Sequence, residues 1–544
     1  MSSWKTISRA SLAAVLLAGT AAAQDPIEVE RLDALDPLEV SLPGAALSGR
    51  LWEGTGRDMA EAVLNRLPGV DGDGYASEAL AETARRVLVS GGHPPAGGRG
   101  DAGLARLRTE RLLVAAGADD AFDLLERTPG VNRMPGLARW HAELGFATGQ
   151  PDRACRTANA LLEQRDTAYW LRVRAFCLAL SGQGAAAELT AELARSQAED
   201  AGFDARLYAI TLDTPLADDA PAADSGLEWA MEHYLAGGDA AMPALAEDAP
   251  AWLRRVVHEA GGRHREPAAD PAAAFAEAET LTGRERHHAL EAVLAQGRDR
   301  ELAGRALGLL LADTGGGNRF IHVARHHGRE IETLPVTAAT LEHGYEIALA
   351  ALVVGNVDAA RRWRNALVDG PPRPDPVVMV PAGLVGEGKP GDGTMLPVVP
   401  EPDWTPPAPR RMVALDMAIA IAADRLRGGE FEAIQGAWFE GHGAAVVPDI
   451  LALSRLGAPA PADLRPALLD ARPAAGTGGL AALDMAVRAG AHAEAALLAI
   501  SVLNTAETGS DADAYSRAIA AIDAVGLRRA ALSLLLERAV KRAL

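Results

Sequence analysis

The sequence predicts an all-α protein in which helices pair through short turns, with one proline-rich interruption. Alanine, the strongest helix former, makes up roughly a fifth of the chain. Hydrophobic residues account for 49% of the 544 residues, but aromatic residues for only 4%. Strand-rich folds draw on aromatic and β-branched residues, so this composition disfavours them. A chain this long exceeds one ordinary domain, and we therefore expect several cores or one repetitive array.

Residues 1–23 have the pattern of a signal peptide. Lys5 and Arg9 give a basic start, residues 10–20 are apolar, and Ala21–Ala23 supply the small residues that a signal peptidase needs. About a dozen apolar residues are too few for a span, which needs about twenty. We expect cleavage after Ala23 and a periplasmic or secreted mature chain. The alternative is a frayed N-terminal helix of a cytosolic protein.

The chain then divides at its helix breakers. Residues 24–51 are acidic and interrupted by prolines, which predicts an extended lead-in segment. Residues 52–370 read as a helical-repeat region, with loops at 90–103, at 213–226 and near Pro267. Helical pattern resumes in a C-terminal helical-repeat region, 411–544, with breaks near Pro459 and Gly476.

Residues 371–410 hold twelve of the 33 prolines, so no helix can run through them. The segment is interpreted as a linker between two helical modules; a packed surface insertion or a partner-binding segment is the alternative. Two short pieces, 377–380 and 395–399, have the composition of extended strands.

Cys155 and Cys177 are the only cysteines, and each lies about eleven residues from a break near Asp166. We expect one helix over 151–164 and a second over 167–180. In an antiparallel helix hairpin, positions equidistant from the turn lie at the same height. An oxidising compartment would then favour a disulfide between them. A metal site or two separate buried thiols are the alternatives.

The region 142–197 reads as helix, short turn, helix, repeatedly. Trp170, Val173, Cys177 and Leu180 fall on one helical face. A Gly-x4-Ala spacing recurs at the turns, where glycine lets a helix end and alanine lets the next helix approach closely. The pattern occurs at Gly149/Ala154, Gly182/Ala187, Gly355/Ala360, Gly428/Ala433, Gly490/Ala495 and Gly526/Ala531.

The first two of these glycines are 33 residues apart, and the segment resembles tetratricopeptide-like repeats, whose period is about 34 residues. The resemblance implies an α-solenoid of helix-turn-helix repeats. Such solenoids bind protein or peptide partners on a concave face.

The charge is acidic, with 73 Asp and Glu against 53 Lys and Arg and a formal net charge of −20. This balance argues against nucleic acid and anionic membrane surfaces as partners, because both attract basic patches. Solubility alone is a sufficient reason for it. Beyond the N-terminal segment, no stretch is long and apolar enough to predict an integral membrane segment.

Motifs for catalysis are absent from the sequence. It has no phosphate-binding loop, no Gly-x-Ser-x-Gly elbow and no His-Glu-x-x-His helix. On one helix, His322, His326 and Glu330 would share a face and reach one metal ion, but Gly328 interrupts that helix. We therefore predict no metal, no cofactor and no catalytic residues.

The eight tryptophans after the signal segment are scattered, and their placement on apolar faces predicts core packing. Trp404, between prolines, is the exception: it is a candidate exposed anchor, and the alternative is that it packs the loop down. The eight tryptophans are Trp52, Trp140, Trp170, Trp229, Trp252, Trp363, Trp404 and Trp438.

Together these patterns favour an exported helical-repeat scaffold or adaptor that binds a protein or peptide partner in the cell envelope. The alternative is an envelope glycan or peptidoglycan hydrolase that uses carboxylate acid-base chemistry. That alternative requires a closed helical toroid with two acids in a deep pocket. An enzyme is the less favoured of the two readings.

Overall fold

The computed structural model describes residues 35–47, 49, 51–237, 245–261, 267–371, 378–381, 395–398, 404–459, 461, 477–505 and 511–544. The expected signal peptide and residues 24–34 of the expected lead-in segment lie outside these residues, as does most of the proline-rich segment. Residues Asp36–Leu544 belong to one unit.

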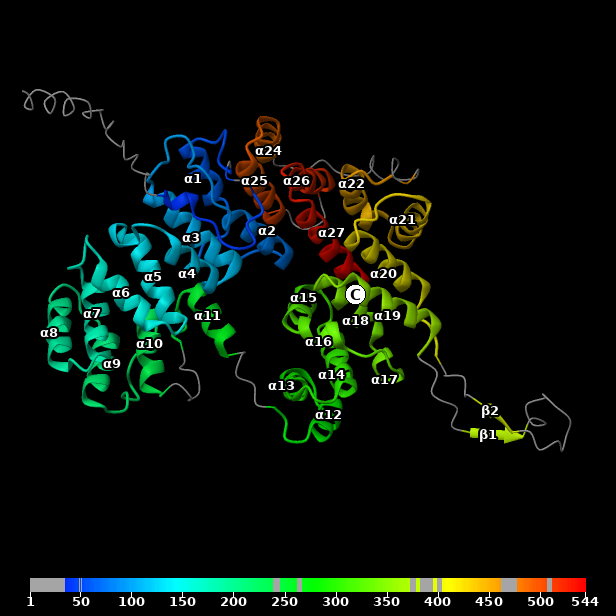
Figure 1. Cartoon of the computed structure of the whole chain (residues 1–544), viewed down its shortest axis with the longest axis horizontal. Helices are drawn as coiled ribbons and strands as arrows, with labels where there is room; N and C mark the ends of the chain where they lie inside the picture. Colours follow the sequence, from blue (N-terminus) through cyan, green and yellow to red (C-terminus); the bar gives the residue numbers. More distant parts are fainter. Residues whose placement is uncertain are drawn as a thin grey trace, which may run out of the picture. The chain divides into compact units, whose positions relative to one another are not determined.

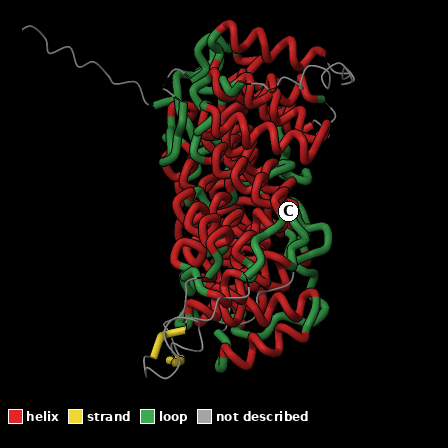
Figure 2. The backbone as a smooth tube through the Cα atoms, turned by 90° about the vertical axis from the view of Figure 1, so that its right-hand side faces the viewer, coloured by secondary structure: helices red, strands yellow, loops and turns green. Residues whose placement is uncertain are grey.

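Most of the described backbone is helical, loops and turns join the helices, and the strands of the described residues are confined to one small hairpin (Figure 2). The first part of the chain contains η1 (Pro37–Glu39), α1 (Arg57–Asn65), α2 (Glu78–Leu88), α3 (Ala102–Ala116), α4 (Ala118–Arg127), η2 (Val131–Arg133), α5 (Pro135–Ala147), α6 (Pro151–Ala160), α7 (Ala168–Leu180), α8 (Gly184–Arg195), α9 (Ala201–Leu212) and α10 (Gly226–Leu235).

The middle part contains α11 (Ala251–Gly261), α12 (Pro271–Thr280), α13 (Gly283–Gln296), α14 (Arg300–Ala312), α15 (Gly317–His326), α16 (Gly328–Thr333), α17 (Ala338–Leu341), α18 (Gly344–Val353) and α19 (Val357–Asp369). The last part contains β1 (Val378–Pro381), β2 (Met395–Val398), α20 (Pro409–Ala422), α21 (Gly429–His442), η4 (Gly443–Val446), α22 (Val447–Arg455), α24 (Thr477–Ala489), α25 (His492–Thr505), α26 (Ala512–Ala524) and α27 (Arg528–Ala543).

The Gly-x4-Ala turns join consecutive helices. All six glycines have a positive φ. Five of them end the preceding helix at low steric cost, whereas Gly428 lies directly before α21. In five of the six pairs the alanine is fully buried against the neighbouring helix; they are Ala154, Ala187, Ala360, Ala495 and Ala531. Ala433 differs, because it faces solvent on α21. The all-helical class is thus confirmed, and neighbouring helices pack side by side as a helical array requires.

Short polar side chains begin many of the helices. Asp101, Asp270, Asp299 and Asn356 each accept a hydrogen bond from a backbone N–H in the first turn of the helix that follows. These caps satisfy amides that have no partner inside the helix.

The described part of the lead-in segment packs into the core. Leu38, Val40 and Leu42 are at most 4% exposed. Arg108 on α3, itself 2% exposed, donates hydrogen bonds to the carbonyl oxygens of Leu38 and Val40 at 3.3 and 2.8 Å, and to that of Leu88 at 2.7 Å. The described part includes the short helix η1, and a buried guanidinium holds it in place.

Helices on both sides of the proline-rich segment share one core. Figure 1 shows α25 beside α1 and α2, and these helices are in contact. The carbonyl of Leu51 accepts a hydrogen bond from Ala493 N at 3.2 Å, and Glu537 accepts one from Ala79 N at 2.7 Å. The two helical regions therefore do not form separate cores. A second hydrophobic cluster is built from α5–α10.

The proline-rich segment is described at its ends and in one hairpin. β1 and β2 pair antiparallel, with Val378 opposite Val398, close to the two pieces expected to be extended. The indole N–H of Trp404 donates to the carbonyl oxygen of Leu367 at 3.1 Å. Trp404 thus packs the end of the segment onto α19 rather than projecting as an anchor.

Among the described residues, no helix combines the length and the apolar character that a membrane span requires.

Candidate functional site

Two adjoining hollows form one extended groove, and we call it the arginine groove. The first, of about 790 Å³, lies between α19, α20, α21 and the start of α27. The second, of about 750 Å³, lies between α2, α15, α18, α20 and α27. Both include Asp424 and Arg528, so the hollows meet at this pair.

Arginines outnumber carboxylates two to one along this groove. The lining arginines are Arg86, Arg325, Arg361, Arg364, Arg425, Arg427, Arg528 and Arg529. The lining carboxylates are Asp416, Asp424, Glu430 and Glu537. A basic groove in a chain with a formal net charge of −20 is a local reversal of charge.

Two of the arginines form two-pronged pairs with carboxylates inside the groove. Arg364 donates to both oxygens of Asp416 at 2.7 and 2.9 Å, and Arg528 donates to both oxygens of Asp424 at 2.9 and 2.8 Å. These hydrogen bonds raise the pKa of each arginine. The second pair stands at the junction of the two hollows.

Three arginines remain exposed to solvent. Arg425, Arg427 and Arg529 have no carboxylate within ion-pair distance in the part of the chain that the structure describes. Arg427 donates instead to the carbonyl oxygen of Gly457 at 3.3 Å. Arginine is suited to recognise carboxylates, because its planar guanidinium offers several donors in a fixed fork.

Apolar side chains line the groove between the charges. In the first hollow they include Ile419, Phe431 and Ile434, and in the second Ile321 and Leu532. A groove with an apolar surface and basic side chains fits a peptide that alternates apolar and acidic side chains. None of the arginines was a candidate in the sequence. The usable signal was the clustering of four of them: Arg425 and Arg427 lie in the turn before α21, and Arg528 and Arg529 in the first turn of α27.

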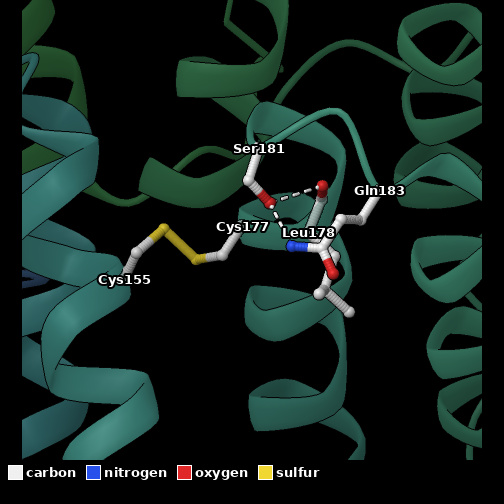
Figure 3. Close-up of a disulfide and its surroundings, with 5 residues drawn as sticks. All are labelled: Cys155, Cys177, Leu178, Ser181 and Gln183. Atoms are coloured by element: carbon white, nitrogen blue, oxygen red, sulfur yellow. Dashed lines mark hydrogen bonds between the residues drawn. A yellow bond between two sulfur atoms is a disulfide. The ribbon is translucent and has the colours of Figure 1, made fainter.

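Cys155 and Cys177 form a disulfide that joins α6 to α7 (Figure 3). Their Cα atoms are 5.7 Å apart. The first helix ends at Ala160 and not at Gln164, because Leu161 leaves helical geometry and is buried. Leu162 N then bonds the carbonyl oxygen of Asn132 at 3.0 Å. The bridge lies far along the chain from the residues of the arginine groove.

The histidine cluster does not gather at a metal site. His322 Nδ1 is 3.2 Å from Glu78 Oε1 on α2, and Glu330 lies on α16, beyond the end of α15. Buried His327 instead approaches Glu291 on α13, with Nε2 and Oε1 3.3 Å apart. Among the described residues, no group of three or more His, Cys, Asp or Glu could hold a metal ion.

Six of the eight tryptophans are at most 5% exposed and belong to the core, as expected. Trp140 is a correction to that expectation, because it is only partly buried and lines a hollow of about 640 Å³ with Trp252.

A three-residue network joins α4, α5 and α6. His141, 4% exposed, lies with Nε2 2.6 Å from Glu126 Oε1 and with Nδ1 2.8 Å from the hydroxyl oxygen of Thr157. An ionised carboxylate only accepts, so Nε2 carries the proton and Nδ1 accepts from Thr157. Burial lowers the pKa of His141, and the hydrogen bond to Glu126 offsets part of that shift.

Comparison of the chain with protein-family models, curated proteins and solved structures finds no match. The functional argument therefore depends on the chemistry of the described residues.

Proposed function

We propose that this protein is an exported helical scaffold that binds a partner protein by holding an acidic, partly apolar segment of it in the arginine groove. One observation carries the proposal: a groove lined by eight arginines and four carboxylates in a strongly acidic chain. Opposite charges guide the encounter and select the partner, while apolar contacts supply much of the affinity.

The position of the groove supports the proposal. Its lining comes from seven helices, so an occupant would touch elements from both ends of the chain. Binding along helix arrays commonly uses such extended surfaces. Export is part of the proposal and is supported by the N-terminal pattern and by the disulfide. Mass spectrometry of the protein recovered from the periplasm should find Gln24 as its first residue.

A photo-crosslinking experiment tests the groove directly. Ala433 lines the first hollow and faces solvent, so a photoreactive amino acid there would sit beside the occupant. We expect irradiation of intact cells to give a discrete adduct, and the crosslinked peptide to be acidic. The same group at Glu188, on α8 outside the groove, should not give that adduct.

Charge reversal provides the matched comparison. Arg425→Glu with Arg529→Glu should abolish the adduct. Arg165→Glu with Arg298→Glu changes the net charge equally but lies outside the groove, and should leave the adduct unchanged. An adduct that survives the groove variant, or a crosslinked peptide that is basic, would rule the proposal out.

The hydrolase alternative has weaker support. Its best carboxylates are Glu110 and Glu143, which line the hollow beside Trp140. Glu110 accepts hydrogen bonds from Trp140 and Arg106, and Glu143 accepts one from Gly226 N at 2.8 Å. A general acid and base must be available to substrate and water, and these carboxylates are engaged by the chain itself.

A further inference from the structure

A third hollow, the one lined by Trp140 and Trp252, shares no lining residue with the arginine groove, and we call it the tryptophan hollow. It has a volume of about 640 Å³ and lies between α3, α5 and the starts of α10 and α11. This volume is within the range of small-molecule sites. The backbone pairing of Ala223 with Leu245 brings together the two loops that precede α10 and α11.

Trp140 forms a fixed aromatic surface at this hollow. Its indole N–H donates to Glu110 Oε1 at 3.1 Å. Trp252 packs edge-on against it, with ring centroids 5.5 Å apart and an interplanar angle of 74°. Trp252 is 5% exposed, whereas Trp140 is only partly buried and can meet a ligand. The ring is thus held in one orientation before any ligand arrives.

Both hydrogen-bond donors and hydrogen-bond acceptors surround this ring. The hollow is lined by two arginines, Arg106 and Arg139, and by the hydroxyl-bearing Ser225. It is also lined by four carboxylates, of which Asp224 and Asp248 are exposed. Arg139 lies over the ring of Tyr169 at 4.6 Å, and Arg106 bonds Glu110, so both guanidinium groups are held in place.

The mixture of charges selects the class of ligand. An anion would face four carboxylates, and a cation would face two arginines, so neither sign of charge is matched throughout. A sugar has hydroxyl groups that both donate and accept, and one face of its ring presents C–H groups to an aromatic surface. A neutral polyol can therefore hydrogen-bond the donors and acceptors of the hollow and also pack against its aromatic ring.

We propose that the tryptophan hollow binds a neutral oligosaccharide, with a pyranose ring stacked on Trp140 and its hydroxyl groups bonded to Arg106, Arg139 and the carboxylates. This site is distinct from the arginine groove, since no residue lines both. It gives the scaffold a second ligand of a different chemical class.

Calorimetry and saturation-transfer NMR test the proposal on the full-length exported protein. The probes are cellotetraose, maltotetraose and N-acetylchitotetraose, with tetramethylammonium and citrate as charged comparisons. We expect at least one tetrasaccharide to bind with a millimolar or lower Kd, and neither ion to compete with it. Failure of all three sugars to bind, or displacement of the sugar by either ion, would overturn the proposal.

Substitutions locate the binding. Trp140→Ala should weaken binding by at least about tenfold, and Trp140→Phe, which keeps a ring, by less. Asp248→Ala removes an exposed carboxylate at the hollow without disturbing the core, and should weaken binding severalfold even if Trp140→Ala fails to fold. Trp404→Phe, outside the hollow, should bind as the unmodified protein does. Equal binding by Trp140→Phe, Asp248→Ala and the unmodified protein would place the sugar elsewhere and refute the assignment.

Discussion

Asp424 occupies a backbone conformation that usually favours glycine. Its φ is +51°, and it follows the end of α20 in the position that Gly149, Gly182 and Gly355 occupy after other helices. A non-glycine residue in the left-handed region costs on the order of 1 kcal/mol. At this turn the side chain that replaces glycine is the one that bonds Arg528 at the junction of the two hollows.

Replacing Asp424 by glycine should therefore have opposing effects on stability. The substitution removes the backbone strain of a non-glycine residue at positive φ, and it also removes an exposed ion pair worth about 0.2–1 kcal/mol. We expect the free energy of unfolding, measured by urea denaturation, to change by less than about 1 kcal/mol. Asp424→Asn, which tolerates the same backbone but loses the ion pair, should be the less stable of the two. A large loss of stability in the glycine variant would contradict this account.

His141 couples the stability of the α4–α6 region to pH. Its pKa is lowered by burial, so the folded protein holds fewer protons on this group than the unfolded chain does. Glu126 is its hydrogen-bonded neighbour, and Arg153 and Arg156 also act on its charge. The imidazole therefore stabilises the fold above the ordinary pKa of 6.5, and this contribution is lost as pH falls below that value.

Chemical denaturation at pH 7.5 and pH 5.0 tests this linkage. The unmodified protein should lose stability toward pH 5, and His141→Gln should lose less over the same interval because its side chain does not titrate. An identical pH dependence for His141→Gln and the unmodified protein would exclude the role assigned to His141.

At the scale of the elements, the disulfide restrains one helix hairpin. It closes a loop of 22 residues between α6 and α7, within the second hydrophobic cluster. In the chain-entropy account, a loop of this length stabilises the fold by roughly 3 kcal/mol.

Cys155→Ser with Cys177→Ser should lower the midpoint of thermal unfolding, because the unfolded chain regains that freedom. In hydrogen-exchange measurements, we expect the backbone amides of α6–α8 to lose the most protection, since these helices depend on the second hydrophobic cluster. Thr190→Ser, an exposed change on α8, is the control. An unchanged midpoint under non-reducing conditions would show that the bridge contributes little.

The lead-in segment depends on one side chain. Arg108 donates to backbone carbonyls of the lead-in segment, of Leu88 at the end of α2 and of Ser90, and burial lowers its pKa to about 10. A buried guanidinium is stabilising only when its donors are all satisfied. These carbonyl oxygens would lose their partners together if the guanidinium were removed.

Arg108→Met should therefore cost about 3 kcal/mol or more in the free energy of unfolding, because several buried carbonyls lose their donors. Limited proteolysis should cut within 36–51 faster than in the unmodified protein. Arg362→Met, at an exposed position of α19, should change neither measurement. Resistance of the Arg108→Met segment to protease would mean that its apolar side chains suffice to hold it.

At the scale of the whole molecule, the distribution of charge separates the arginine groove from the rest of the chain. Asp and Glu exceed Lys and Arg by 20 over the full sequence, whereas arginines prevail in the groove. A field of this kind acts on the approach of a charged partner more than on its departure.

Salt should therefore slow the association of the protein with the acidic segment that we expect crosslinking to identify. Raising NaCl from 50 to 300 mM should reduce the association rate by about tenfold or more and change the dissociation rate by less. Stopped-flow fluorescence with a labelled synthetic copy of that segment measures both rates. An association rate that does not depend on salt would remove electrostatic attraction from the mechanism.

The helix hairpins follow from local chemistry, which is why the sequence predicts them. Gly149 and Gly182 end one helix and begin a turn whatever lies around them, because only glycine adopts that conformation at low cost. The fully buried Ala154 and Ala187 follow from the same spacing. The height of Cys155 and Cys177 on their helices depends only on distance from the turn.

The arginine groove and the tryptophan hollow were not predictable in this way. Arg86 and Arg529 are more than 400 residues apart, and neither sits in a motif. Both line the arginine groove because α2 packs against α27, a contact made by apolar faces that could equally have met other faces in the chain. The contact between Trp140 on α5 and Trp252 on α11 was likewise not predictable, because these helices are far apart in the sequence.

The sequence by itself determined the helical class, the position of most turns and the pairing geometry of the cysteines, because each depends on neighbours within a few residues or on one hairpin. Only the tertiary structure decided that the described part of the lead-in segment is buried and that both helical regions share one core. It also decided which side chains line the arginine groove and the tryptophan hollow. Burial of apolar surface drives those contacts. Because the hydrophobic effect is not directional, the sequence pattern does not specify which apolar faces will pack together.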